Sequence, residues 1–127
     1  MAVHFGLSWR GLKISLQRRF GRYANIRKGQ RYVAIRDVED VLCVTHWRAP
    51  FTGGYRVIFP KGEAVVLPDD FAPGATGVAC LPERYDHFLA AFIPESDRTA
   101  SKFTGYHLTI YFDTFANAFQ ILPDRHD

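Results

Sequence analysis

Two cysteines and two histidines of this 127-residue chain are the first candidates for chemistry, because together they could form a zinc site. Cys43 precedes His46 by three residues, and Cys80 with His87 could complete a set of two thiolates and two imidazoles. Residues three apart in a strand point to opposite faces, so Cys43 and His46 are poorly placed to bind one ion. The spacing also matches no standard zinc pattern. We therefore predict structural roles for these side chains, with no metal site and no cofactor.

Cys80 and His87 are also a candidate pair of nucleophile and base. A strand end followed by a helix N-terminus would lower the pKa of a thiol there, and Asp86 or Glu83 could orient the imidazole. Against this, Cys80 lies in the apolar run 78–81, where core packing is the commoner role of a thiol. Both cysteines lie in apolar runs, which indicates buried free thiols more than a disulfide. We predict that this pair does not catalyse a reaction.

The acidic residues and glycines suggest no enzyme either. Asp69-Asp70 could join Glu83 and Asp86 in a site for a hard cation, but adjacent acids in a loop rich in Pro and Gly are usually solvated. The glycines of residues 74–77 lack the Lys-Ser/Thr tail of a phosphate-binding loop. We therefore predict a protein without enzyme activity.

Charge is distributed unevenly along the chain. Residues 1–36 contain nine Lys or Arg and no Asp or Glu, whereas the remainder holds seven basic and all thirteen acidic residues. Such a basic arm can bind a polyanion, dock on the acidic body of its own chain, or dock on a partner copy. The side chains that we predict to contact a binding partner are Trp9, Arg10, Lys13, Arg18, Arg19, Arg22, Arg27, Lys28 and Arg31.

This basic arm favours a binding or accessory module. Protein–protein interaction or self-association is the first hypothesis. The alternative is binding of single-stranded nucleic acid or RNA, in which Arg and Lys contact phosphates while one of the interleaved rings stacks on a base, namely Trp9, Phe20, Tyr23 or Tyr32. Peripheral contact with an anionic membrane is less favoured, because glycines interrupt the segment. An acid-free, Arg-rich N-terminus also resembles an organellar transit peptide.

The N-terminal arm has an amphipathic pattern. From Phe5 to Tyr23, six apolar residues recur at steps of three or four, which predicts a helix with one apolar side. Three glycines weaken this helix by about 1 kcal/mol each. The alternative is a strand over Leu12–Leu16, where apolar and polar residues alternate. We prefer the helix.

The centre of the chain predicts a hairpin on which the rest of the fold is arranged. Two apolar stretches within residues 55–67 flank Pro60-Lys61-Gly62-Glu63, a turn whose Gly tolerates positive φ and whose Pro cannot donate to a ladder. Further strands are predicted over residues 31–35, 41–47, 78–81 and 106–112. The strand at 41–47 is apolar on both faces.

Two helices are predicted in the second half of the chain. Aromatic and aliphatic residues between Glu83 and Phe92 recur at helical spacing, with Pro82 placed to start the helix and Pro94 to end it. Asp113 is a suitable N-cap for a final helix that extends to residue 122.

Several segments resemble a known type of domain. Lys28-Gly29-Gln30-Arg31-Tyr32-Val33-Ala34-Ile35, the turn Phe59-Pro60-Lys61-Gly62-Glu63, and Leu81-Pro82-Glu83-Arg84-Tyr85 followed by Phe92-Ile93-Pro94 are similar to small bacterial domains of unknown function with an SH3-like barrel. The resemblance covers residues 28–122 and implies no activity. With the order of elements, it predicts an α+β fold, in which an SH3-like antiparallel β-meander or barrel carries an N-terminal amphipathic helix and two short C-terminal helices.

Length and composition indicate one domain, 1–127, made of a basic segment 1–27 and a β-rich core 28–122. The hydrophobic content of 47% and aromatic content of 15% argue against disorder. No run approaches the roughly 20 apolar residues that span a bilayer. The N-terminus also lacks the apolar core of a secretory signal, so we expect a cytoplasmic protein.

Overall fold

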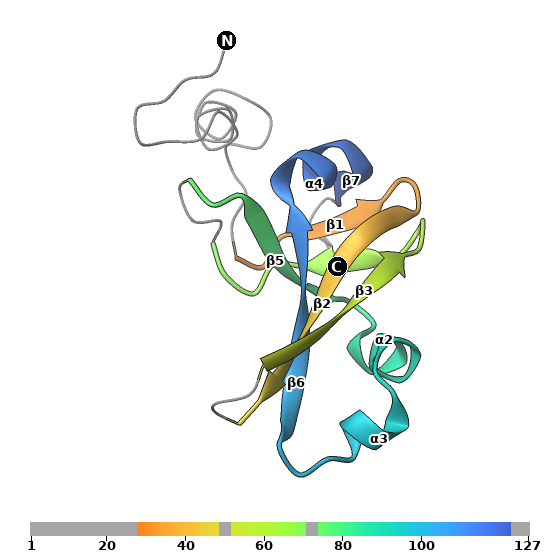
Figure 1. Cartoon of the computed structure of the whole chain (residues 1–127). Helices are drawn as coiled ribbons and strands as arrows, with labels where there is room; N and C mark the ends of the chain where they lie inside the picture. The colour runs from red at the N-terminus through yellow and green to blue at the C-terminus, as the bar shows by residue number, and fades with distance from the viewer. Residues whose placement is uncertain (1–27, 49–51, 71–73, 123–127) are drawn as a thin grey trace.

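Seven strands make up most of the computed structural model, which describes residues 28–48, 52–70 and 74–122 (Figure 1). They form one antiparallel sheet in the order β3-β2-β6-β5-β4-β1-β7. The strands are β1 Arg31–Ala34, β2 Val38–Trp47, β3 Thr52–Phe59, β4 Ala64–Val66, β5 Gly77–Pro82, β6 Phe103–Tyr111 and β7 Phe119–Leu122.

Strand β5 joins the two halves of this sheet. Its first four residues pair with β6, and its last two, Leu81 and Pro82, pair with β4. One half therefore consists of β3, β2 and β6, and the other of β4, β1 and β7. Figure 1 shows the first half as a long ribbon of three strands that extends away from α4 and β7.

Three short helices connect the later strands. They are α2 (Tyr85–Phe92), α3 (Glu95–Arg98) and α4 (Phe112–Ala118). The helix predicted from Glu83 is confirmed as α2, which begins two residues later and buries Phe88. Figure 1 places α2 and α3 beside the three-stranded ribbon.

The predicted α+β fold class is wrong. The described residues are mostly sheet, with only about 21% helix. A meander keeps consecutive strands adjacent, whereas here β6 lies between β2 and β5, and β1 lies between β4 and β7. The predicted N-terminal helix lies outside the described residues.

The last predicted helix is correct only in part, because α4 begins at Phe112 with Tyr111 at the N-cap position, so that Asp113 lies in the first turn and is not the cap. The helix ends at Ala118, and Phe119 takes an extended conformation with φ −123° and ψ 146°. Residues 119–122 then pair with β1 as strand β7. Backbone pairing with a neighbouring strand outweighs the helical spacing of the side chains, which is a local preference only.

The prediction of a central hairpin is also wrong, because its two strands do not pair with each other, although the predicted turn is present. Gly62 has a φ of +89°, as a turn glycine can, but β3 pairs with β2 while β4 pairs with β1 and β5. The turn is bound to the connection between β1 and β2. Gly62 N–H donates to the carbonyl of Ala34 at 2.8 Å, and Lys61 N–H donates to Asp37 Oδ1 at 2.8 Å. These bonds fix the turn between β3 and β4, which belong to different halves of the sheet.

A cluster of aromatic rings fills the core between the two halves. Phe59 is fully buried at the end of β3, and its ring centroid lies 5.3 Å from that of Phe88 and 5.9 Å from that of Phe119. Phe119 stacks on Phe115 at 4.8 Å, and Phe115 meets the edge of Tyr32 at 4.9 Å. Rings at these distances bury large apolar areas and add a favourable aromatic contact. The cluster therefore connects β3, α2, α4, β7 and β1.

We expect Phe59→Ala to lower the free energy of unfolding by about 3–5 kcal/mol, because it leaves a cavity where three elements meet. The matched control is Ile121→Ala on β7, whose side chain is exposed and should cost no more than about 1 kcal/mol. Urea unfolding of the full-length chain measures both. Equal costs for the two variants would contradict the assignment of Phe59 to the core.

Candidate functional site

The sheet has a buried face and an open face. Along β2, Val41, Cys43 and Thr45 are buried, so the residues between them point the other way. Strand pairing extends this second face across the neighbouring strands, and we call it the outer face. It is formed by Leu42, Val44 and His46 of β2, Arg56 and Ile58 of β3, His107, Thr109 and Tyr111 of β6, and Gly77 and Ala79 of β5.

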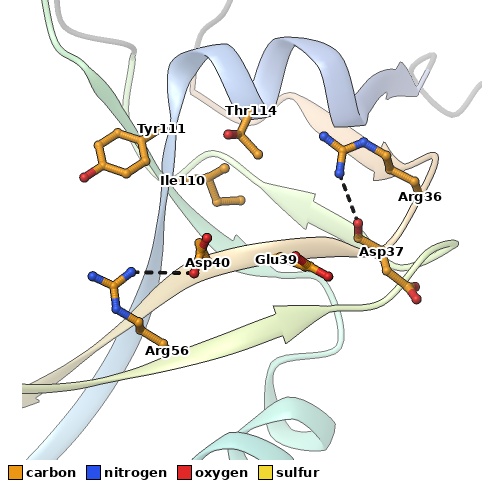
Figure 2. Close-up of a pocket in the computed structure, with 8 residues that line it drawn as sticks. All are labelled: Arg36, Asp37, Glu39, Asp40, Arg56, Ile110, Tyr111 and Thr114. Carbon is orange, nitrogen blue, oxygen red and sulfur yellow. Dashed lines mark hydrogen bonds and ion pairs between the residues drawn. The ribbon is translucent and has the colours of Figure 1, made fainter.

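A hollow lies at the end of the outer face where β6 runs into α4 (Figure 2). It consists of two cavities of about 420 Å³ and 540 Å³ that share Asp40, Arg56 and Tyr111, and we call it the Tyr111 cleft. Gly77, which pairs with Tyr111 across β5 and β6, lines the smaller cavity and has no side chain to occupy it. Both volumes fall within the range of about 300–1,000 Å³ that is usual for ligand pockets.

An irregularity in β2 positions Asp40 at the cleft. The register between β2 and β3 shifts between Val38 and Val41, and Asp40 has a φ of +56°. Asp tolerates this left-handed conformation better than most residues. Such bulges re-aim side chains and occur often next to functional sites. Here the bulge turns an acidic side chain toward the rim of the cleft, as Figure 2 shows.

The charged groups of the cleft are available to a ligand. Arg56 Nη1 lies 3.8 Å from Asp40 Oδ1, but the two side chains are 73% and 79% exposed, so their attraction is weak. Arg36 donates to the carbonyl of Asp37 at 3.2 Å, and Glu39 completes the rim (Figure 2). Charges of both signs therefore border the hollow.

Apolar side chains continue the cleft onto the open sheet. Leu42 is 40% exposed, Tyr111 55% and Ile58 59%. They come from three adjacent strands, β2, β6 and β3. The sequence pattern contained a signal for this face, because residues 41–47 are apolar on both sides, but it did not indicate which side would stay open.

Two histidines lie together farther along the outer face. His46 Nε2 is 2.5 Å from His107 Nδ1, and the two rings are tilted by 53° with centroids 4.8 Å apart. Partial burial lowers the pKa of His107, and the nearby His46 lowers it further. Sequence reasoning missed this pair, because the residues are 61 positions apart.

The thiols lie on the buried face, as predicted. Cys43 and Cys80 are both buried and unbonded, and His46 points from the opposite face to Cys43. His87 is exposed on α2 and packs against the ring of Phe88. Burial raises the pKa of Cys43 to about 12 and raises that of Cys80 as well. A thiol in this state is a poor nucleophile.

The predicted basic site is described only at its end. Arg31 forms two hydrogen bonds of 2.8 Å with the carboxylate of Glu83, so this guanidinium already has an acidic partner. Lys28 N–H donates to Asp70 Oδ1 at 2.8 Å. The other seven residues of that set, from Trp9 to Arg27, lie outside the described residues, and their role stays a prediction.

Comparisons with protein-family models, with curated proteins and with solved structures find no match to this chain. The resemblance to SH3-like domains therefore stays a prediction. Within the described ranges, no helix combines the length and the apolar character that crossing a bilayer requires. The candidate site thus rests on its own geometry.

We expect both cysteines to resist iodoacetamide at pH 8 in the native chain and to react in urea. A pKa of about 12 lowers the thiolate fraction of Cys43 at this pH on the order of a thousandfold relative to an exposed thiol. Mass spectrometry of the full-length protein counts the alkylated residues. If Cys80 of the native protein were labelled as fast as in urea, the result would contradict an unreactive thiol and support Cys80 and His87 as a reactive pair.

We expect stability to fall as the pH drops below the usual histidine pKa of about 6.5, because the folded chain lowers the pKa of His107 and so disfavours its protonated form. His107 therefore contributes no pH dependence above that value. The measurement compares the unfolding midpoint of the wild type with that of His107→Gln at pH 7.5 and 5.5. The wild type should lose more stability than the variant between these two pH values. An equal loss would contradict a lowered pKa of His107 in the folded chain.

Proposed function

We propose that this chain is a protein-interaction module that holds an extended segment of a partner polypeptide along β3 and over the Tyr111 cleft. The observation that carries the proposal is the exposure of Leu42, Ile58 and Tyr111 on three adjacent strands of the outer face. Scattered apolar residues are normal on a surface, but a group beside a cleft indicates a contact site.

The edge of the sheet supports the choice of an extended segment. β3 ends the strand order, so in the described ranges its second edge has no pairing strand. An edge strand presents N–H and C=O groups in a row, and a partner segment can add to it as a further strand. With eight residues, β3 is long enough to fix the register of such a segment.

The cleft supports a partner with both apolar and charged side chains. A segment paired with β3 would place alternate side chains on the outer face, beside Ile58 and Arg56. Tyr111 lies on β6, two strands in from β3, so the part of the partner that continues past the paired residues must cross the outer face to place an apolar side chain in the hollow. Arg56 and Asp40 can then pair with groups of opposite charge and orient the segment, because their mutual ion pair is weak.

The described residues favour binding over catalysis. Their two thiols are buried with raised pKa values, and the polar groups that line the cleft are Arg, Asp and Glu side chains, a tyrosine and threonines, with no cysteine or histidine among the lining residues. The absence of enzyme activity, the cytoplasmic location and the nucleic-acid alternative all stay predictions.

The test is selection of a random peptide display library on the full-length protein. We expect enriched peptides with alternating apolar residues, and at least tenfold weaker binding to Leu42→Glu and Ile58→Glu, since each change adds a charge to the contact. The matched control is Ile121→Glu, an exposed isoleucine on the opposite edge strand β7, which should bind as the wild type does.

Two outcomes would contradict the proposal. One is the absence of enriched peptides, and the other is binding that Leu42→Glu and Ile58→Glu leave unchanged. Sedimentation velocity of the full-length chain decides a related point: a dimer that Ile58→Glu dissociates would make a second copy the occupant of the edge. Binding that vanishes between low and moderate salt would instead indicate a polyanion.

A further inference from the structure

The pair of His46 and His107 has no role in the proposed function. His46 lies opposite Gly105 in the pairing of β2 with β6, so His107 is its diagonal neighbour on the same face. The two rings lean together until Nε2 of His46 and Nδ1 of His107 are 2.5 Å apart. Two ring nitrogens from different strands therefore converge on one point at the surface.

The hydrogen bond between the rings requires one N–H and one lone pair. In the neutral pair, one imidazole donates from the facing nitrogen and the other accepts. If the donor ring carries its proton on the other nitrogen instead, both facing nitrogens present lone pairs. Neither ring gains or loses charge in this change of tautomer. Two lone pairs at such a distance repel each other unless a cation binds both.

We propose that His46 and His107 form a surface site for a late first-row divalent ion such as Zn²⁺ or Cu²⁺. Neutral imidazole is a preferred ligand of both ions. With metal–nitrogen bonds of about 2.0–2.1 Å, two nitrogens stand about 3.3 Å apart in tetrahedral geometry and about 2.9 Å apart at a right angle. The rings must therefore separate by less than about 1 Å, which side-chain rotation on an open face provides.

The site is accessible and incomplete. His46 is exposed and His107 is partly exposed, so an ion can reach both from solvent. In the described ranges, no group of three or more His, Cys, Asp or Glu is arranged to hold a metal. The described residues therefore supply two of the ligands of the ion. Such a site exchanges its metal readily, unlike a closed structural zinc site.

The test titrates EDTA-treated full-length protein with Zn²⁺ and with Cu²⁺ in a calorimeter. We expect Cu²⁺ to bind more tightly than Zn²⁺. His46→Gln and His107→Gln should each weaken binding at least tenfold, because one imidazole cannot chelate. His87→Gln removes an exposed histidine on α2 and should leave the affinity unchanged. Unfolding curves of the metal-free variants establish that each one folds.

A measurement on the wild type needs no substitution. Addition of Zn²⁺ should shift the imidazole NMR resonances of His46 and His107 together and leave those of His87 in place. The proposal is overturned if neither ion binds at millimolar concentration, if all three variants bind as the wild type does, or if the shifted resonances belong to other histidines.

Discussion

Burial of the Phe59 ring is the constraint on which the rest of the structure depends. The ring lies between α2 and β7, where the two halves of the sheet meet. Side chains of a strand alternate between faces, so once Phe59 points inward its neighbour Ile58 must point outward. Pairing between β3 and β2 then sets which face Leu42 takes. One buried aromatic residue thereby decides which side chains of β3 and β2 lie on the outer face.

The turn after Phe59 determines which strand β4 pairs with and therefore the order of the strands. Lys61 is hydrogen-bonded to Asp37 in the connection between β1 and β2, and Gly62 to Ala34 at the end of β1, so the chain after the turn runs beside β1 and not back along β3. Strand β4 instead joins β1, and β3 is left as the last strand of the order. The same connection leads into the bulge at Asp40. An edge strand, an acidic side chain and a hollow are therefore products of one local arrangement.

The two faces of the sheet separate two kinds of chemistry. The thiols lie inside, where burial raises their pKa values and suppresses reactivity. The imidazoles and the mixed charges lie on the outer face, where they are exposed or partly exposed to solvent. Cys43 and His46 belong to the same strand, yet odd spacing places them on opposite faces. A zinc set that combines them is thus excluded by strand geometry, while a pairing of His46 with His107 is allowed by it.

The sequence by itself determined the local features of this protein. Alternating side chains predicted strands close to β2 and β6, short apolar stretches predicted strands close to β1 and β5, helical spacing predicted α2, and Gly62 predicted its turn. These features depend on steric preferences of neighbouring residues, which a linear pattern records.

Only the tertiary structure decided the strand order, the conversion of residues 119–122 from helix to strand, and both proposed sites on the outer face. Each of these depends on contacts between distant residues, such as Arg56 with Asp40 or His46 with His107, and on which apolar face finds a partner in the core. The spacing of residues along a chain indicates neither which distant residues come into contact nor which apolar face packs in the core.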